Sequence, residues 1–223
     1  MLALVGSGEY LPDMEGVDRF LLAGLGDNPK VVCLPTAAGT EGPQRIAYWS
    51  DMGSNYFKSL GVNARALPVI TRKDAQDPAL GAQVGEADFV YLSGGRPDYL
   101  LAVLKDSLVW QAIQDVLARG GILAGCSAGA MILGEKIPGF PGWRRAFNLL
   151  DGAVIMPHFD EIPAWMVRVV HHWIGRRERL VGVPGYTALV ANGKTCWVVG
   201  KSNVTLWDRD GKRSFTPGES LAW

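Results

Sequence analysis

One serine in this chain has the surroundings of an enzymatic nucleophile. Ser127 lies in the segment GGILAGCSAGAM, with Gly125 and Gly129 two residues away on either side. The apolar residues 122–124 predict the end of a buried strand, and the small residues after Ser127 predict the start of a helix. A sharp strand-to-helix turn exposes its apex side chain in a cleft, and the helix N-terminus favours developing negative charge. We therefore interpret Ser127 as a candidate nucleophile, with an ordinary strand-to-helix turn as the alternative.

A serine hydroxyl needs a base, and the chain has three histidines. His158 follows the apolar segment 153–157, which predicts a second strand end, and from such a position an imidazole can reach Ser127 and take its proton. General-base catalysis of this kind contributes roughly 10²–10⁴-fold in rate. His171 and His172 are neighbours within a helical pattern, so they cannot both face one point, and we expect half-buried helix residues. The alternative for His158 is a capping position before that helix.

Main-chain amides that could stabilise an oxyanion come from two segments. The tetrapeptide Ser93–Arg96 follows the predicted strand Phe89–Leu92 and contains two adjacent glycines. Glycines at a strand end allow the backbone to approach a ligand and to point amide hydrogens toward it. We therefore predict that the amides of Gly95 and of Ala128, the residue after the candidate nucleophile, form an oxyanion hole. Each such donor raises the reaction rate by about 10²-fold or more.

Motifs for cofactors and metals are incomplete. Gly6-Ser7-Gly8 begins like a dinucleotide loop, but Leu11 stands where G-x-G-x-x-G requires its third glycine, and the chain has no GxxxxGK phosphate loop. The segment HFDE at 158–161 lacks a second histidine at metal-ligand spacing. Cys126 lies beside Ser127, but a shift of one residue turns its side chain away from the cleft. We expect no cofactor and no metal.

The composition excludes several classes of protein. The 223 residues include 22 Lys plus Arg and 22 Asp plus Glu, so no basic surface argues for nucleic acid. The three cysteines lie in separate apolar segments and predict reduced, buried thiols rather than disulfides or a zinc site. The start MLALVGSGEY predicts a first strand rather than a signal peptide, and no apolar segment approaches the roughly 20 residues that span a bilayer. We expect a cytoplasmic protein without nucleic-acid or membrane partners.

Apolar segments alternate with helical patterns over the first two thirds of the chain. This alternation predicts a mostly parallel sheet with helices on both faces. The predicted strands are Leu2–Val5, Val31–Leu34, Ala64–Val69, Phe89–Leu92 and Ile122–Ala124, and the predicted helices are Met14–Leu25 and Gln44–Leu60. Ligand sites of open α/β sheets lie beyond the carboxyl ends of the strands, where Ser127 and the Gly94-Gly95 segment both stand.

After His158 the pattern changes to one helix followed by strands. The helix is predicted at Ile162–Ile174, and the strands at Leu180–Val183, Thr187–Val190, Thr195–Val199 and Val204–Trp207. Asn192-Gly193 and Asp210-Gly211 predict hairpin turns. We therefore expect C-terminal antiparallel β-hairpins added to the parallel sheet. The chain shows no repeat or linker, so we expect a single domain over residues 1–223.

Five motifs of the chain occur together and in order in one known family. They are VGSGEY at 5–10, YLSGGRPDYLL at 91–101, GCSAGAM at 125–131, MPHF at 156–159 and VGVPGYTALV at 181–190. With these motifs the chain resembles the serine peptidase family of aspartyl dipeptidase (peptidase E) and cyanophycinase. The resemblance implies a class-I glutamine-amidotransferase-like three-layer α/β sandwich without metal or organic cofactor. It also implies hydrolysis of short or unusual peptides by a Ser-His-Glu triad.

The resemblance assigns the roles of nucleophile to Ser127, of base to His158 and of oxyanion donors to Gly95 and Ala128. The acid is different, because Gly185 stands where the cyanophycinase branch has the glutamate of G-I-D-E-x-T-A-L. Loss of the orienting carboxylate costs about 10⁴-fold in kcat where it has been measured. Asp160 is the first expected substitute because its position is similar to the H-x-E arrangement of amidotransferase domains. Glu135 and Glu9 are next, and we expect surface positions for Glu161 and Asp151.

Arg96 is a second departure from the resemblance, since the family often has asparagine or a similar polar residue after its glycine pair. Its guanidinium could bind a substrate carboxylate in a bidentate manner, and the alternative is an ion pair with Asp98 or Glu9. The irregular segment 137–148 between the candidate nucleophile and base is expected to overhang the cleft and help to select substrate.

The leading hypothesis is a serine peptidase that hydrolyses short peptides, in the manner of a dipeptidase or exopeptidase, with a non-standard or missing triad acid. The alternative is a catalytically impaired homologue that binds a peptide or small molecule on the same scaffold. An esterase or amidase would keep the mechanism and change the substrate. The eight tryptophans, Trp197 and Trp207 among them, fit either a homodimer interface or core packing.

Overall fold

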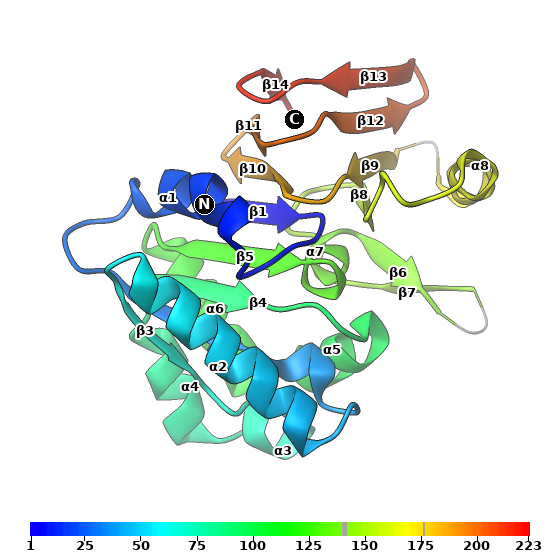
Figure 1. Ribbon diagram of the computed structural model, residues 1–223. Helices are drawn as coiled ribbons and strands as arrows, with labels where there is room; N and C mark the ends of the chain where they lie inside the picture. Colours follow the sequence, from blue (N-terminus) through cyan, green and yellow to red (C-terminus); the bar gives the residue numbers. More distant parts are fainter. Residues whose placement is uncertain (140–141, 176) are drawn as a thin grey trace.

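An eight-stranded sheet forms the centre of the computed structural model, which describes residues 1–139, 142–175 and 177–223 (Figure 1). Its strands are β1 Leu2–Val5, β2 Lys30–Leu34, β3 Asn63–Ala66, β4 Phe89–Leu92, β5 Ile122–Cys126, β10 Thr187–Asn192, β11 Thr195–Gly200 and β14 Ser220–Ala222. They follow the order β14-β11-β10-β1-β5-β4-β2-β3. The five strands from β1 to β3 in this order are parallel, and β10, β11 and β14 pair antiparallel along one edge.

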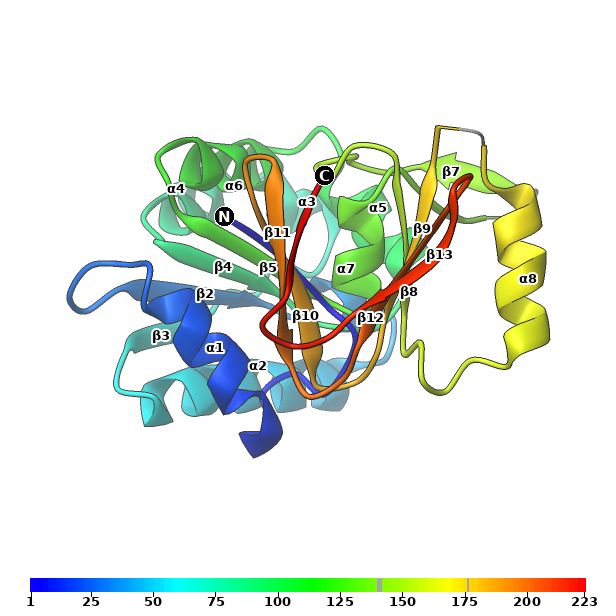
Figure 2. The ribbon, with the colours of Figure 1, turned by 90° about the horizontal axis from the view of Figure 1, so that it is seen from above.

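Helices cover both faces of this sheet, as the alternating pattern predicts (Figure 2). One face packs against α1 (Glu15–Leu22) and α2 (Pro43–Ser59). The other packs against α3 Arg72–Ala75, α4 Pro78–Gly85, α5 Pro97–Leu104, α6 Leu108–Ala118 and α7 Ala128–Leu133. Strands β1, β4 and β5 are buried along their whole length, because a parallel sheet of this kind is covered on both faces. The fold is therefore the predicted three-layer α/β sandwich.

A second, smaller sheet lies beside the edge that β10 and β11 form (Figure 1). Its strands are β8 Ala153–Pro157, β9 Arg179–Val183, β12 Val204–Asp208 and β13 Gly211–Phe215. Strands β8 and β9 are parallel and are connected through α8 (Ala164–Trp173), whereas β12 pairs antiparallel with both β9 and β13. Strand β8 ends directly before His158, so this second sheet positions the candidate base.

The predicted C-terminal antiparallel hairpins are present, and β10 and β11 extend the central sheet, whereas β9 and β12 do not. These two strands belong to the second sheet instead. Pro184 follows β9 and has no amide hydrogen to continue a strand ladder. Tyr186 then adopts a φ of +55°, so the chain turns between β9 and β10 and enters the other sheet.

Local patterns otherwise predict the elements well. The Asn192-Gly193 and Asp210-Gly211 turns connect β10 to β11 and β12 to β13, as predicted. The strand expected at Ala64–Val69 ends earlier, at Ala66, and the helix expected from Met14 consists of a 3₁₀ turn (Pro12–Met14) followed by α1. Across the described residues, no helix is long and apolar enough to cross a bilayer.

One carboxylate is buried in the apolar layer between α1 and the sheet. Asp18 is fully buried, and its Oδ2 accepts a hydrogen bond of 2.8 Å from the hydroxyl of Tyr56. Burial raises the pKa of Asp18 to about 7, and the hydrogen bond from Tyr56 opposes this shift only in part. The native state therefore binds a proton on Asp18 at pH values where the unfolded chain has released it.

We expect the stability contributed by protonated Asp18 to be complete below about pH 4 and to be lost as the pH rises to about 7. Between pH 5 and pH 8 the wild-type protein should lose about 2–3 kcal/mol of unfolding free energy relative to Asp18→Asn. Urea denaturation of both proteins at the two pH values measures this difference. An equal pH dependence in the two proteins would show that Asp18 titrates normally.

Candidate active site

Ser127 occupies a sharp turn between β5 and α7, as predicted. Its φ and ψ are +50° and −110°, which lie outside the regions that non-glycine residues favour. The amide of Ser127 donates to the carbonyl of Val5 at 3.0 Å, and its carbonyl accepts from the amide of Met131 at 3.0 Å. The turn is therefore fixed to the central sheet on one side and to the first turn of α7 on the other.

The two glycines of G-x-S-x-G allow α7 to begin against the end of the strand. A Cβ atom on Gly125 would lie 2.4 Å from the carbonyl carbon of Gly129, and one on Gly129 would lie 2.5 Å from the carbonyl oxygen of Leu92. Real Cβ atoms do not approach backbone atoms this closely. The spacing of the motif thus follows from close packing between β5, α7 and β4.

His158 lies directly after β8, and its Nε2 is 3.1 Å from the Oγ of Ser127. The φ of His158 is +51°, so the chain turns at the strand end and directs the imidazole toward the central sheet. The next residue anchors this turn: the amide of Phe159 donates to the carbonyl of Val183, and its ring packs over Gly182. The structure thus brings the predicted nucleophile and base together from two different sheets.

The two carboxylates after His158 have different surroundings. Asp160 Oδ1 accepts a hydrogen bond of 2.9 Å from the amide of Gly185, the residue at the expected acid position. Glu161 Oε2 lies 3.5 Å from His158 Nδ1, although 70% of the Glu161 side chain is exposed. Nδ1 itself is buried and has no hydrogen-bond partner among the residues that the structure describes. Glu161, expected only at the surface, is thus the carboxylate placed beside the imidazole.

Glu9 is buried beneath the turn at Ser127 rather than beside His158. Its Oε1 accepts from the amide of Gly94 at 2.8 Å, and its Oε2 accepts from the thiol of Cys126 at 2.9 Å. Burial, followed by the negative charge of Glu9, raises the pKa of the Cys126 thiol well above its usual range. Cys126 is therefore held protonated and turned inward, and Glu9, which follows β1, connects the segment after β4 with the last residue of β5.

The amides of Gly95 and Ala128, which are predicted to form the oxyanion hole, differ from the amides next to Gly95 in their hydrogen bonding. On either side of Gly95, the amide of Gly94 donates to Glu9 and the amide of Arg96 donates to the carbonyl of Ala37 at 3.0 Å. Gly95 has a φ of +140°, and a Cβ there would lie 2.5 Å from the Ala37 carbonyl oxygen. Among the described residues, the amides of Gly95 and Ala128 have no acceptor. Their role as oxyanion donors stays a prediction.

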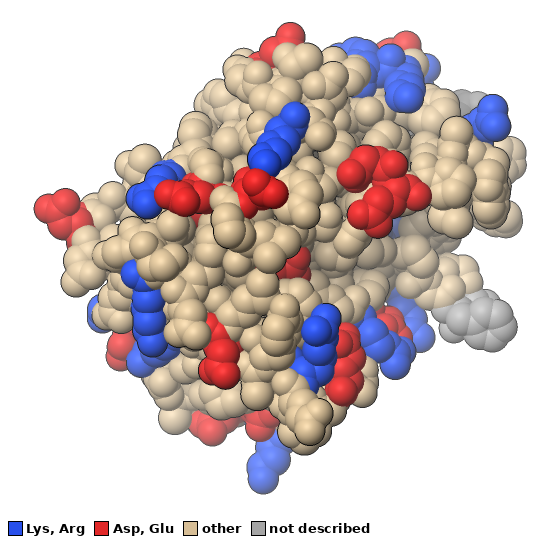
Figure 3. Space-filling view, in the orientation of Figure 1, with Lys and Arg blue, Asp and Glu red and all other residues tan. Residues whose placement is uncertain are grey.

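Arg96 forms the ion pair that the sequence offers as its alternative role. Its Nη2 lies 2.9 Å from Asp98 Oδ2, and the hydrogen bond from Arg96 lowers the pKa of Asp98. The Arg96 and Asp98 side chains are 57% and 39% exposed. On the face drawn in Figure 3, such basic and acidic side chains are interspersed rather than gathered in one patch of either sign.

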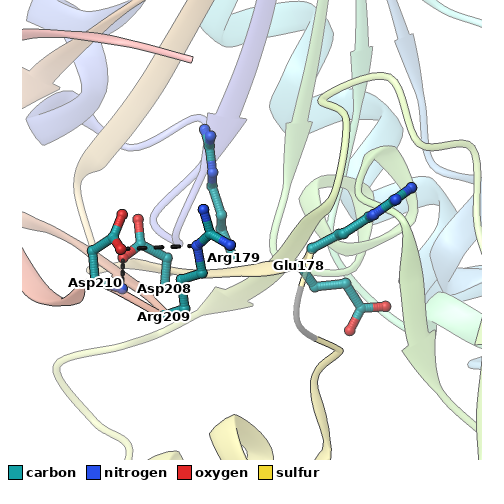
Figure 4. Close-up of a pocket in the computed structure, with 6 residues that line it drawn as sticks. Glu178, Arg179, Asp208, Arg209 and Asp210 are labelled. Carbon is teal, nitrogen blue, oxygen red and sulfur yellow. Dashed lines mark hydrogen bonds and ion pairs between the residues drawn. The ribbon is translucent and has the colours of Figure 1, made fainter.

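Two cavities lie at the other end of β8 and β9. One, of about 430 Å³, is lined by Glu135 and Asp151, which places both of these carboxylates away from His158. The other, of about 360 Å³, is shown in Figure 4, and its acidic and basic residues largely pair with oppositely charged neighbours. It is lined by Arg177, Glu178, Arg179, Asp208, Arg209 and Asp210. Neither cavity contains the candidate nucleophile.

The segment 137–148 includes residues 140 and 141, which lie outside the described residues. Its described part contains most of a short hairpin of β6 (Lys136–Pro138) and β7 (Trp143–Arg145). In Figure 1 this hairpin projects on the same side of the molecule as α8. Its expected contribution to substrate selection stays a prediction.

The sequence model of peptidase family S51 matches residues 2–199. The chain belongs to this family. It is therefore a serine-type peptidase, and the turn at Ser127 lies in the part of the chain that the family shares.

Individual relatives agree with this assignment. An uncharacterised peptidase from Listeria monocytogenes is 23% identical over 176 residues, covering 74% of this chain and 82% of the relative. One from Pasteurella multocida is 28% identical over 158 residues, covering 66% and 73%. The crystal structure of a peptidase from an acI-B1 actinobacterium has a TM-score of 0.90 and 33% identity, over 100% of this chain and 96% of that one. A peptidase E-like structure from Listeria monocytogenes shares the fold, with a TM-score of 0.67, 21% identity and coverages of 90% and 98%.

The close packing of Gly129 at the turn after β5 predicts an effect of substitution on stability. Gly129→Ala should lower the free energy of unfolding by about 1–3 kcal/mol, because its methyl group would overlap the Leu92 carbonyl. Gly16→Ala is the matched control in helix α1, where a Cβ meets nothing within 4 Å, and it should stabilise by about 0.5–1 kcal/mol. Urea denaturation measures both. Equal stability of Gly129→Ala and wild type would contradict the close packing.

Proposed function

We propose that this S51 peptidase hydrolyses short peptides with Ser127 as nucleophile and His158 as general base. The observation that carries the proposal is the 3.1 Å distance between Ser127 Oγ and His158 Nε2. At this distance the imidazole can accept the hydroxyl proton while Oγ bonds to the scissile carbonyl carbon. The carbonyl electron pair moves to its oxygen, and a tetrahedral oxyanion results.

The second half of the reaction returns the proton. As the carbon–nitrogen bond breaks, protonated His158 donates to the leaving amine, and the acyl group stays bound to Ser127 Oγ. Water then attacks the acyl carbon and gives a proton to His158, and the ester bond to Oγ breaks. The products are the two peptide fragments, and Ser127 regains its proton from His158.

The amides of Gly95 and Ala128 are the proposed oxyanion donors. Support comes from their neighbours, since Glu9 and the Ala37 carbonyl bind the amides on either side of Gly95 and fix its orientation. Ala128 begins α7, so the helix N-terminus adds to the positive potential at this point. Donors that are fixed before the reaction stabilise developing charge without reorganising.

Arg96 is the proposed contact for a carboxylate of the substrate. It follows Gly95 directly, and its present partner Asp98 is exposed, so a substrate carboxylate can compete for the guanidinium. A free carboxylate close to the scissile bond is a feature of short peptides, which agrees with the resemblance to dipeptidases. The three free, buried cysteines fit the proposed cytoplasmic location.

Covalent labelling tests the nucleophile. A fluorophosphonate probe should label the wild-type protein at Ser127, and Ser127→Ala should show no labelling, because the proposed mechanism activates the Ser127 hydroxyl through His158. Ser54→Ala is the control, because its hydroxyl only donates to the Ser50 carbonyl within helix α2. Mass spectrometry of the labelled peptide identifies the site. An unlabelled wild-type protein would favour the non-catalytic binding protein.

Turnover of peptides tests the base. His158→Gln should lower kcat/KM on a cleaved dipeptide by about 10²–10⁴-fold. His172→Gln, an exposed histidine of α8, should leave it unchanged. The substrate is found by incubating the wild-type protein with a panel of dipeptides and activated esters and detecting the hydrolysis products by chromatography. Equal activity of His158→Gln and wild type would remove His158 from the mechanism, and hydrolysis of esters alone would identify an esterase.

A further inference from the structure

We propose that Glu161 is the positioning residue that orients His158, and that Asp160 holds the turn that carries both. The inference rests on the proposed roles of Ser127 and His158. It deepens them by assigning the carboxylate that the chain uses although Gly185 stands at the usual position of the acid.

The imidazole needs an acceptor on the side that faces away from Ser127. When Nε2 accepts the serine proton, Nδ1 carries the other proton of the imidazolium and requires a hydrogen-bond acceptor. Nδ1 is buried, and within the described ranges it has no hydrogen-bond partner. Glu161 Oε2 lies 3.5 Å from it, so a shift of less than 1 Å in an exposed side chain completes the hydrogen bond. Exposure leaves the side chain free to make this small movement.

The backbone places Glu161 under the imidazole. The amide of Glu161 donates to the carbonyl of His158 at 2.9 Å and closes a turn that begins at a left-handed residue. This turn returns the third residue after His158 toward the ring. A carboxylate three positions along the chain thus lies 3.5 Å from Nδ1, so the acid itself does not have to come from the β9–β10 connection.

Asp160 contributes through the backbone rather than through the ring. Its Oδ1 accepts from the amide of Gly185, which ties the 158–161 turn to the connection between β9 and β10. A Cβ on Gly185 would lie 2.9 Å from Ser7 Oγ and 3.5 Å from Asp160 Oδ2, so these two polar groups surround position 185. The Asp160 distance is an ordinary van der Waals contact, so a side chain at position 185 would mainly displace the Ser7 hydroxyl. In this inference Asp160 holds the turn, and Glu161 orients the imidazole of His158.

The experiment compares charge and size at positions 161 and 160. Glu161→Gln keeps the size but removes the charge, and it should lower kcat by about 10- to 100-fold with little change in KM, a smaller loss than for a buried acid. Glu161→Asp keeps the charge and should retain more activity than Glu161→Gln. Asp160→Asn should retain more activity than Asp160→Ala, because an amide oxygen still accepts from the Gly185 amide. Glu15→Gln, an exposed carboxylate of α1, is the control and should match wild type.

Two readouts separate this inference from the proposed function. Fluorophosphonate labelling of wild type shows whether Ser127 reacts at all, and its absence would overturn the mechanism itself. If wild type reacts and Glu161→Gln reacts equally fast, or if Glu161→Asp is no better than Glu161→Gln, the assignment of Glu161 is wrong. A loss in Asp160→Asn as large as that expected for Glu161→Gln would assign the orienting role to Asp160 instead. Thermal unfolding of each variant confirms that it is folded.

Discussion

The backbone at Ser127 is held in a conformation that is unfavourable by about 1–3 kcal/mol, and the arrangement of the site depends on this constraint. The conformation persists because β5 lies between β1 and β4, and because α7 packs back onto the strand through Gly125 and Gly129. The same turn brings the hydroxyl, the Ala128 amide and the helix N-terminus to one point. A looser turn would separate the nucleophile from the groups that stabilise the negative charge it creates.

The remaining groups reach this point from elements that are far apart in the chain. His158 comes from the second sheet, where the pairing of β8 with β9 and the contacts of Phe159 and Asp160 with the β9–β10 region hold the turn that carries it. Glu9, which follows β1, joins the segment after β4 to the last residue of β5. The chemistry therefore depends on how two sheets meet, and changes that shift the second sheet should affect the base before they affect the nucleophile.

The features that local sequence determines were predictable, whereas those set by long-range pairing were predictable only where strand ends indicated them, as for Ser127 and His158. The turn at Ser127 follows from neighbouring glycines, and the central strands follow from short apolar segments. The second sheet depends on the pairing of β9 with β12, which the hydrophobic periodicity of the sequence does not encode. The contact of Glu9 with Cys126 joins residues 117 positions apart. Which of Asp160 and Glu161 lies beside Nδ1 depends on the left-handed backbone of His158, which the H-x-E spacing that favoured Asp160 does not encode.

A crystal structure of the protein after reaction with a peptide phosphonate or boronic acid tests the central claim most directly, because such adducts imitate the tetrahedral intermediate. We predict a covalent bond to Ser127 Oγ, with one oxygen of the adduct about 3 Å from both the Gly95 and the Ala128 amides. His158 should remain within hydrogen-bond distance of the reacting oxygen. An adduct on another residue, or an adduct at Ser127 whose oxygens face only solvent, would contradict the account.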